Sequence, residues 1–424
     1  MMCILSVRRS VVALLTLISI FLLPLSAAPR KKPLKGKAKT AIARVSSKRP
    51  SKAKLRTSAK LVRASAPRWG QAKWRKAKSS KRSRSRGSVR TARRDFVAGG
   101  PWYEPTFADS TIGDNIDGED LTVRRAAVEA LGPYNGSVVV ADAQNGRILS
   151  VVNQKVAFRS GFQPCSTIKI VAALAGLSEG VIDRGTHMHL YGRTTMNLTD
   201  ALASSNNPYF ANIGVRLGYD KIAYYARLFG LGEKAGFNIR QETAGSIPDG
   251  PPANGGMGMM MSFGEGIKLT PLQLTALLSS IANGGTLYWL QHPRTQEDAA
   301  NLVPRIKRQL DIGSAIPELK PGLLGAVEYG TARRAIFDPI EPIAGKTGTC
   351  TDRATPTHLG WFGSFNEVGP RRLVVVVLLT GGRPVNGPVA SGIAGMVYRN
   401  LSQLQYFAKD QTISSLALSP GAFF

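Results

Sequence analysis

Residues 163–177 read QPCSTIKIVAALAGL, a stretch that places a serine and a lysine at the start of an apolar run. Pro164 suits the first turn of a helix, so Ser166 is predicted at the amino end of one, where free backbone N–H groups favour a developing negative charge. Lys169 lies on the same face one turn along. Apolar neighbours lower the proton affinity of a lysine, and a neutral amine near a hydroxyl is a general base. The stretch therefore predicts a serine nucleophile with a lysine base.

A serine three residues before a lysine is weak evidence by itself. Ser51 and Lys54 repeat the pattern in a stretch rich in basic residues, and a helix cap is the simpler interpretation of Ser166 alone. Two further motifs strengthen the case, because residues 201–210 read ALASSNNPYF and residues 346–349 read KTGT.

The KTGT motif has the residue types of a substrate-binding strand. On a strand that lines a cleft, Gly348 would let a substrate backbone approach closely, and Thr347 and Thr349 would offer hydroxyls to a carboxylate. Lys346 would add a fixed positive charge. A turn is the simpler interpretation of Lys-Thr-Gly alone.

Strand patterns occur near both ends of the folded part, at residues 137–142, 147–153, 360–366 and 373–379. An Asn-Gly turn signal joins the first pair, and LVVVVLL at 373–379 is apolar on both faces, which predicts a central strand. Helical runs fill residues 164–290, and a closing helix is expected over 390–407. The pattern predicts an antiparallel sheet formed from both ends of the chain, with a helical lobe inserted and a site between the two.

The motifs Ser-x-x-Lys, Ser-x-Asn and Lys-Thr-Gly, in this order, are typical of penicillin-binding proteins and serine β-lactamases. Residues 133–407 resemble the transpeptidase domain of penicillin-binding proteins, also in FGLG at 229–232, in residues 264–285 and in YGTA at 329–332. The resemblance implies an α/β fold of the α+β type. It has a five-stranded antiparallel sheet flanked by helices, plus an inserted all-helical lobe.

The resemblance also implies roles for the first and third motifs. Ser166 resembles the acylated nucleophile, and Lys169 resembles its base. Lys346 would tune the middle motif, while Thr347 and Thr349 would bind the terminal carboxylate of the substrate. The backbone N–H groups of Ser166 and Thr349 would form the oxyanion hole.

The middle motif fits two registers: Ser204 with Asn206, or Ser205 with Asn207. The family places an Ala-Leu pair before this motif and an aromatic pair after it, and the pairs at 201–202 and 209–210 favour the second register. In that register Ser205 would relay a proton to the leaving amine, and Asn207 would hold Lys169 and the substrate amide.

Two cysteines flank the proposed chemistry. Cys165 precedes Ser166, and Cys350 follows the KTGT motif, so the resemblance brings both to one cleft. In an exported protein they would form a disulfide if their Cα atoms lie within about 7 Å, and the alternative is two small buried residues with free thiols. With three cysteines and four histidines in the chain and no Cys-x-x-Cys pattern, neither a metal site nor a cofactor is expected.

Three features differ from the usual family pattern or compete with the motifs. Glu265 stands where the family often has a glutamine between glycines, so this edge of the cleft is expected to be more acidic. Asp352 and His358 follow the KTGT motif and are expected to have surface roles in a loop. No pedestal or glycosyltransferase domain is expected before residue 133, which indicates a transpeptidase domain on a tether.

The net charge of +29 comes from one low-complexity segment. Residues 30–94 hold 26 Lys and Arg and no Asp or Glu, while the part from Asp95 onward has 28 basic and 27 acidic residues. Residues 29–98 are therefore interpreted as a disordered basic tether. It is either a solvated tail or an anchor to an anionic membrane or wall polymer. Trp69 and Trp74, without a motif around them, do not indicate a specific nucleic-acid partner.

The amino terminus has the layout of a secretory signal. Two arginines precede an apolar run at residues 10–25, and small residues follow at 26–28. Residues 1–28 are therefore a cleaved signal peptide or a retained membrane anchor, and both imply export. Residues 99–132 are interpreted as a linker, and residues 408–424 as a tail.

The resemblance implies a D,D-transpeptidase that cross-links peptidoglycan stem peptides at D-Ala-D-Ala and is inhibited by β-lactams. If water replaces the acceptor amine, the enzyme is a D,D-carboxypeptidase. A serine β-lactamase is a second hypothesis, although Asn207 fills a position where the lysine-activated class carries an aliphatic residue, and the other major class needs a Glu-x-x-x-Asn loop that is not found. A non-catalytic penicillin-binding receptor is the third, but binding alone does not need Lys169.

Overall fold

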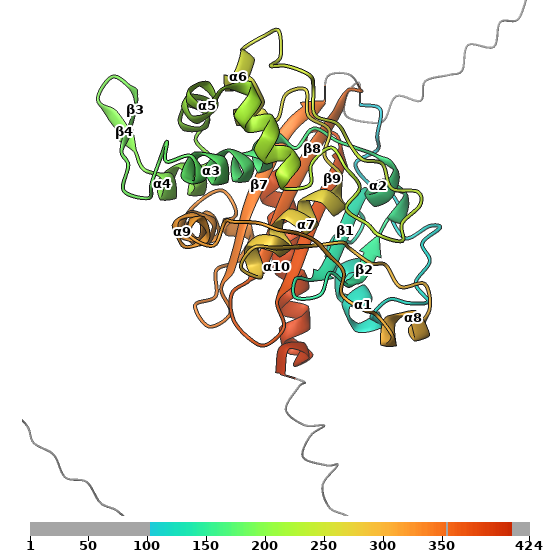
Figure 1. The fold of residues 1–424 in the computed structure, drawn as a ribbon. Coiled ribbons are helices and arrows are strands. Elements are labelled where there is room, and N and C mark those ends of the chain that lie inside the picture. Colours follow the sequence, from blue (N-terminus) through green and yellow to red (C-terminus); the bar gives the residue numbers. More distant parts are fainter. Residues whose placement is uncertain (1–101, 353–354, 409–424) are drawn as a thin grey trace, which may run out of the picture. The chain divides into compact units, whose positions relative to one another are not determined.

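The computed structural model describes residues 102–352 and 355–408, and their centre is a five-stranded antiparallel sheet (Figure 1). The strand order is β2-β1-β9-β8-β7, so strands from both ends of this part of the chain meet in one sheet. The strands are β1 (Gly136–Asp142), β2 (Ile148–Val152), β7 (Ile343–Asp352), β8 (Thr357–Asn366) and β9 (Leu373–Gly381). The predicted fold class is confirmed.

Strand β9 lies in the centre of the sheet, as its two-faced apolar sequence predicted. It pairs with β1 on one side and with β8 on the other, and all nine of its residues are buried. Val374 and Val376 face one hydrophobic core, and Val375 and Val377 face the other. Alternate residues of one strand therefore hold together two layers of helices.

One face of the sheet is covered by α1 (Leu121–Leu131) and α10 (Gly387–Gln403). Helix α10 begins three residues before the predicted start, because Asn386 caps it and Pro388 occupies its first turn. Helix α1 corrects the interpretation of residues 99–132 as a linker. Val123 and Leu131 of α1 are buried in the core against the sheet, so the folded unit includes this segment.

The other face of the sheet is covered by α7 (Pro271–Ala282). The buried hydrophobic residues of α7 belong to the same hydrophobic core as Val374 and Val376 of β9. The sequence specifies the start of α7 in detail. Thr270 accepts from the backbone N–H of Gln273, and the Gln273 side chain accepts from the backbone N–H of Thr270, which is a capping box followed by proline. The Gln273 amide also donates to the carbonyls of Glu233 and Ala244, so one buried side chain fixes three segments.

The inserted lobe lies beside the β7 edge of the sheet in Figure 1. Its helices are α3 (Lys169–Ser178), α4 (Leu198–Ala203), α5 (Asn207–Leu228), α6 (Gly256–Phe263) and α9 (Ala315–Glu328). The lobe also contains a hairpin of β3 (Met188–Tyr191) and β4 (Thr194–Met196), which an all-helical expectation missed. The remaining elements are α2 (Gln154–Arg159), α8 (Gln296–Ala300), β5 (Thr286–Tyr288), β6 (Ile306–Gln309) and the 3₁₀ turns η1 (Cys165–Ile168), η2 (Arg333–Ala335) and η3 (Tyr406–Ala408).

In the described part of the chain, no helix is both long enough and apolar enough to cross a membrane. The predictions of a signal peptide or anchor at 1–28 and of a basic tether at 29–98 fall outside the described residues. So does the predicted tail beyond residue 408.

Candidate active site

Ser166 lies in η1, a single 3₁₀ turn, and the α-helix begins only at Lys169. The sequence predicted a helix that already contained the serine. The difference arises at Thr167, whose backbone N–H and hydroxyl both donate to the carbonyl of Pro164, at 3.2 and 2.6 Å. These contacts favour the tighter i to i+3 turn. Ser166 as a residue is 9% exposed, and its hydroxyl donates to the Ser262 carbonyl at 3.3 Å.

Lys169 is fully buried, and its Nζ contacts the middle motif. It donates to the backbone carbonyl of Ser205 at 2.6 Å, to the side-chain oxygen of Asn207 at 2.6 Å and to the hydroxyl of Ser205 at 3.1 Å. The two residues of the alternative register make other contacts. Ser204 is exposed and donates to the Asp200 carbonyl at 2.6 Å, and Asn206 caps α5. The geometry therefore brings Lys169 together with Ser205 and Asn207.

Burial and, to a smaller extent, the nearby charge of Lys346 together lower the pKa of Lys169 to about 6. The Phe210 ring lies 5.6 Å from Nζ and forms part of its surroundings. At neutral pH the amine is therefore largely uncharged, which is the state that can accept a proton from a hydroxyl.

Ser205 is held in the left-handed region, with φ of 58°. Its N–H donates to the Leu202 carbonyl, and the N–H of Asn206 donates to the Ala201 carbonyl, which together form a Schellman motif at the end of α4. Glycine usually occupies this position because it adopts a positive φ without strain. A serine there keeps a hydroxyl beside Lys169, and strained backbone of this kind clusters at functional sites.

Lys346 lies in β7 and is fully buried, and its Nζ donates to the Thr347 carbonyl at 3.2 Å. Burial lowers its pKa to about 7. At neutral pH this lysine is therefore partly protonated, and its role as a positive charge for a carboxylate stays a prediction. The charge of Lys346 in turn disfavours the protonated form of Lys169.

Gly348 lies where strand β7 packs closely against the 3₁₀ turn that carries Ser166. A Cβ at this position would lie 3.0 Å from the Pro164 carbonyl oxygen and 3.2 Å from the Cys165 Cβ. The glycine therefore lets β7 pack directly against η1. A disulfide between Cys165 and Cys350, whose Cα atoms are 5.5 Å apart, joins the same two elements. Cys165 itself has a φ of 52°, so the residue before Ser166 is also strained.

The two threonines of the motif have different surroundings. Thr347 is buried, and its hydroxyl lies 2.6 Å from that of Thr331. Thr349 is exposed, and its hydroxyl accepts from the backbone N–H of Gly387 at 2.8 Å. Thr331 belongs to the YGTA stretch at 329–332, which the sequence marked by resemblance but to which it gave no role.

Ser262 is a second residue that the sequence did not indicate. Its carbonyl accepts from Ser166, and its hydroxyl donates to the Asn207 carbonyl at 3.0 Å, so it links the first and middle motifs. It lies in a Met-rich run in α6 that gives no signal for a functional serine. Nearby, the Glu265 carboxylate accepts from the side-chain amide of Gln163 at 3.2 Å. Gln163 stands two residues before Cys165 in the chain, so this carboxylate lies close to the turn that carries Ser166.

Asp352 and His358 lie on strands, so the prediction of a loop position is wrong. Asp352 ends β7, is buried and pairs with Lys268 at 2.9 Å. His358 is in β8, and its Nδ1 lies 2.8 Å from the Thr351 hydroxyl. Burial, followed by the charge of Arg383, lowers the pKa of His358. Over the residues that the structure describes, no group of three or more His, Cys, Asp or Glu is arranged to hold a metal ion.

Together these residues can support acyl transfer. A hydroxyl on a strained turn, a buried neutral amine three residues further along the chain, and a serine that touches this amine are the parts of a nucleophile, a base and a proton relay. The strand β7, bonded to the same turn by the disulfide, adds hydroxyls and a second titrating lysine.

Comparison with known proteins gave a family match over most of the described fold. The model of the "Penicillin binding protein transpeptidase domain" matches residues 136–402, which is more than half of the chain. A D,D-transpeptidase domain of a peptidoglycan glycosyltransferase from Eggerthella lenta has a similar fold, with a TM-score of 0.54 and 20% identity, over 67% of this chain and 81% of that one.

Two curated relatives show the extent of the similarity. Stage V sporulation protein D of Bacillus subtilis (strain 168) is 27% identical over 283 residues, which cover 59% of this chain and 44% of the relative. Peptidoglycan D,D-transpeptidase PbpA of Mycobacterium tuberculosis (strain ATCC 25618 / H37Rv) is 26% identical over 340 residues, which cover 64% of this chain and 68% of the relative. The match thus spans less than half the length of the first of these relatives.

Proposed function

Because the chain belongs to the family of penicillin-binding protein transpeptidase domains, we propose that it cross-links peptidoglycan stem peptides at D-Ala-D-Ala through a serine acyl-enzyme. The observation that carries the proposal is the bonding of the buried Lys169 to Ser205 and Asn207, on the helix that follows the Ser166 turn. Burial gives the lysine the proton affinity of a base, and the turn presents the hydroxyl that this base would activate.

In the acylation step, Oγ of Ser166 attacks the carbonyl carbon of the penultimate D-Ala, and the neutral amine of Lys169 takes the hydroxyl proton. The hydroxyl first turns away from the Ser262 carbonyl, which it contacts at 3.3 Å. A contact of this length costs little to break. The backbone N–H groups of Ser166 and Thr349 would hold the oxyanion of the tetrahedral intermediate.

The intermediate then collapses, and the peptide bond to the terminal D-Ala breaks. Lys169, now an ammonium, returns its proton to the leaving amine through the hydroxyl of Ser205, which lies 3.1 Å from Nζ. Asn207 keeps the amine in place during this transfer, because its side-chain oxygen accepts from Nζ at 2.6 Å. The leaving D-Ala departs as a neutral amine, and Ser166 remains as an ester.

In the second step, an amine from a neighbouring stem peptide attacks the ester and gives a proton to Lys169. The ester C–O bond then breaks, and Lys169 returns the proton to Oγ of Ser166, which restores the free hydroxyl and the neutral amine. Before acylation, the carboxylate of the terminal D-Ala of the donor peptide would bind Lys346 in its charged state, with the hydroxyls of Thr347 and Thr349 as donors. The same half-reaction with water would release a shortened peptide, so the acceptor decides between transpeptidase and carboxypeptidase. Since stem peptides lie in the wall, the proposal places the enzyme outside the cytoplasm.

Labelling with a fluorescent penicillin tests the acyl-enzyme. The wild-type chain should form a stable covalent adduct, and Ser166→Ala should form none. Incubation with a stem pentapeptide and an amine acceptor, followed by mass spectrometry, then identifies the acceptor. An amide product supports a transpeptidase, and a hydrolysed peptide alone supports a carboxypeptidase. Fast turnover of a chromogenic β-lactam would instead indicate a β-lactamase, and a wild-type chain that takes up no label would rule out the proposed function.

A further inference from the structure

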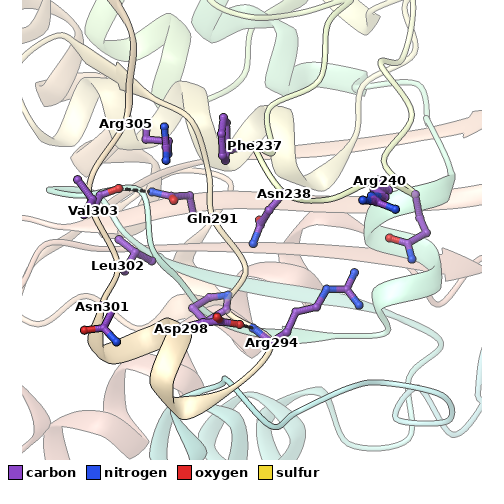
Figure 2. A pocket seen from close by; sticks show the side chains of 12 residues that line it. Phe237, Asn238, Arg240, Gln291, Arg294, Asp298, Asn301, Leu302, Val303 and Arg305 are labelled. Atoms are coloured by element: carbon purple, nitrogen blue, oxygen red, sulfur yellow. Dashed lines mark hydrogen bonds between the residues drawn. The ribbon is translucent and has the colours of Figure 1, made fainter.

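A hollow of about 830 Å³ lies on the protein surface, formed by residues 237–241 and 291–305 (Figure 2). Its second segment is attached to the β2 edge of the sheet, because the N–H of Ile148 donates to the Gln291 carbonyl at 2.8 Å. The candidate active site lies at the opposite edge, which is β7. None of the residues that line this hollow belongs to the candidate active site, so the hollow is a separate place on the surface.

The walls of the hollow are held by their own hydrogen bonds. The side chain of Asn238 donates to the His292 carbonyl at 2.9 Å and accepts from the N–H of His292 at 3.0 Å. The Gln291 amide donates to the Val303 carbonyl at 2.8 Å, a contact drawn in Figure 2. A second hollow of about 330 Å³ adjoins the first, because Gln241 and Arg294 line both. The two form one preformed depression, which we call the arginine groove.

The arginine groove is strongly basic. It is lined by five basic side chains and one acidic one: Lys155, Arg159, Arg240, Arg294, Arg305 and Asp298. Within residues 102–352 and 355–408, none of the five basic side chains forms an ion pair, while the neighbouring Lys307 and Arg308 both pair with Glu233. The Asp298 carboxylate accepts from the backbone N–H of Arg294 at 3.1 Å. Unpaired charge of one sign around a hollow attracts an anion from solution.

The shape and the uncharged residues of the groove narrow the class of ligand. Phe237 is 50% exposed, and the Arg305 guanidinium lies 4.2 Å from the centre of its ring. Figure 2 shows these two side chains next to each other. Gln241 and Asn301 add amides that can both donate and accept. A membrane surface would contact protruding apolar side chains, whereas a concave site with an aromatic ring and amides suits the faces and hydroxyls of sugar rings.

We propose that the arginine groove binds an acidic saccharide strand, in which carboxylate or phosphate groups lie on the arginines and sugar rings pack near Phe237. The proposal rests on the proposed function, because an enzyme that cross-links wall peptides works among saccharide strands that carry anionic groups. Arginine suits this role, since its planar fork holds carboxylate and phosphate oxygens in pairs. Binding at the β2 edge would keep the enzyme on the polymer while the β7 edge carries out the chemistry.

Hydrogen–deuterium exchange of the full chain tests the proposal, because it resolves the groove from the basic segment at 30–94, which will bind any polyanion. The probes are oligogalacturonate for carboxylates, a phosphomannan oligosaccharide for phosphates and a neutral chito-oligosaccharide as the uncharged control. We expect slower exchange at residues 237–241 and 291–305 with either anionic probe and no change with the neutral one. The arm with the larger effect identifies the anionic group.

A matched pair of variants assigns the binding to the groove. Arg240→Gln with Arg294→Gln and Arg305→Gln should remove the protection at the groove and weaken probe binding there by about tenfold or more, because three charge-assisted contacts are lost. Lys52→Gln with Lys54→Gln and Arg56→Gln removes the same charge from the basic segment and should leave the protection intact. Thermal unfolding of both variants shows that each is folded.

The proposal is overturned if the anionic saccharides slow exchange only outside the groove, or if anionic vesicles or single-stranded RNA protect the groove and the saccharides do not. Penicillin labelling of the same wild-type preparation reports separately on the proposed function. A labelled chain without groove protection overturns only this inference. If the groove is protected but penicillin does not label the chain, the saccharide site stands and the proposed acyl-enzyme function is overturned.

Discussion

The two edges of the sheet use positive charge in opposite ways. At the β7 edge, Lys169 and Lys346 are fully buried, and burial lowers their pKa values to about 6 and about 7. At the β2 edge, Arg240, Arg294 and Arg305 are exposed around a hollow. A buried lysine can lose its proton near neutral pH, whereas a guanidinium keeps its charge at any pH at which proteins fold. The charge state of the lysines at the β7 edge therefore changes near neutral pH, whereas the charge of the arginines at the β2 edge does not.

This difference depends on packing and not only on residue type. Lys320 and Lys221 are lysines of the same chain, but their ammonium groups pair with carboxylates, Glu367 and Glu179, at partly exposed positions. Lys169 has no carboxylate partner among the described residues and bonds only uncharged oxygens. Without a counter-charge, the cost of burial acts fully on the charged form and favours the neutral amine.

The largest expected effect follows from removing this amine. Lys169→Met should slow acylation by a fluorescent penicillin by about 10²–10⁴-fold, which is the usual contribution of a general base. The measurement is the second-order rate constant of labelling. The control is Lys221→Met, since Lys221 is exposed on α5 and contacts Glu179 and no site residue. If Lys169→Met labels at the wild-type rate, burial of this lysine has no catalytic purpose and the contrast between the edges fails.

The two neighbouring serines provide the next test. Ser205→Ala should slow acylation by about 10²-fold, because it removes the hydroxyl that touches Lys169 and would relay its proton. Ser204→Ala is the matched control, since Ser204 is exposed and donates to Asp200 outside the network. Labelling rates of the two variants, measured side by side, decide the register. Equal rates would show that contact with the lysine does not matter.

The pH dependence should separate the two edges. Below about pH 6, Lys169 is protonated and cannot accept a proton, so acylation should fall about tenfold for each further pH unit. Above about pH 7, Lys346 loses the charge that would bind a carboxylate, so the rate should fall again. Labelling rates from about pH 5 to about pH 9 should therefore follow a bell. Saccharide protection of the arginine groove should stay constant over the same range, and a flat rate profile would contradict the lysine assignments.

Much of the fold could be predicted because local pattern and tertiary position agree there. The Val and Leu run at 373–379 has no polar face, so only the centre of a sheet covered on both sides suits it. The helix at 271–282 carries its own capping box. Helix α1 was missed because its overall hydrophobicity is low: arginines occupy positions 124 and 125, and three of its five buried apolar residues are alanines, which pack against the sheet and α10.

The residues of the candidate site could be predicted where they belong to a sequence motif. They could not be predicted where their place depends on backbone geometry or on contacts between distant segments. The three motifs indicated Ser166, Lys169 and Lys346, but the 3₁₀ turn at the serine depends on a threonine hydroxyl that bonds back to Pro164. Ser262 and Thr331 act through contacts made across the fold, and neither stands in a pattern that marks a function. The arginine groove joins segments more than fifty residues apart, so single-sequence periodicity could not indicate it.

The smallest expected effect on acylation comes from the disulfide at the β7 edge, which has no counterpart at the β2 edge in the described residues. Cys165→Ala with Cys350→Ala should lower the free energy of unfolding by about 2–4 kcal/mol, because the bond closes a long loop. Acylation should change far less than in Lys169→Met or Ser205→Ala, since the cysteine sulfurs do not bond Lys169, and Gly348 still lets β7 pack against η1. Denaturant unfolding and labelling rates of the double variant measure both quantities. A loss of acylation as large as that of Lys169→Met, in a folded variant, would show that the covalent bond and not the packing positions Ser166.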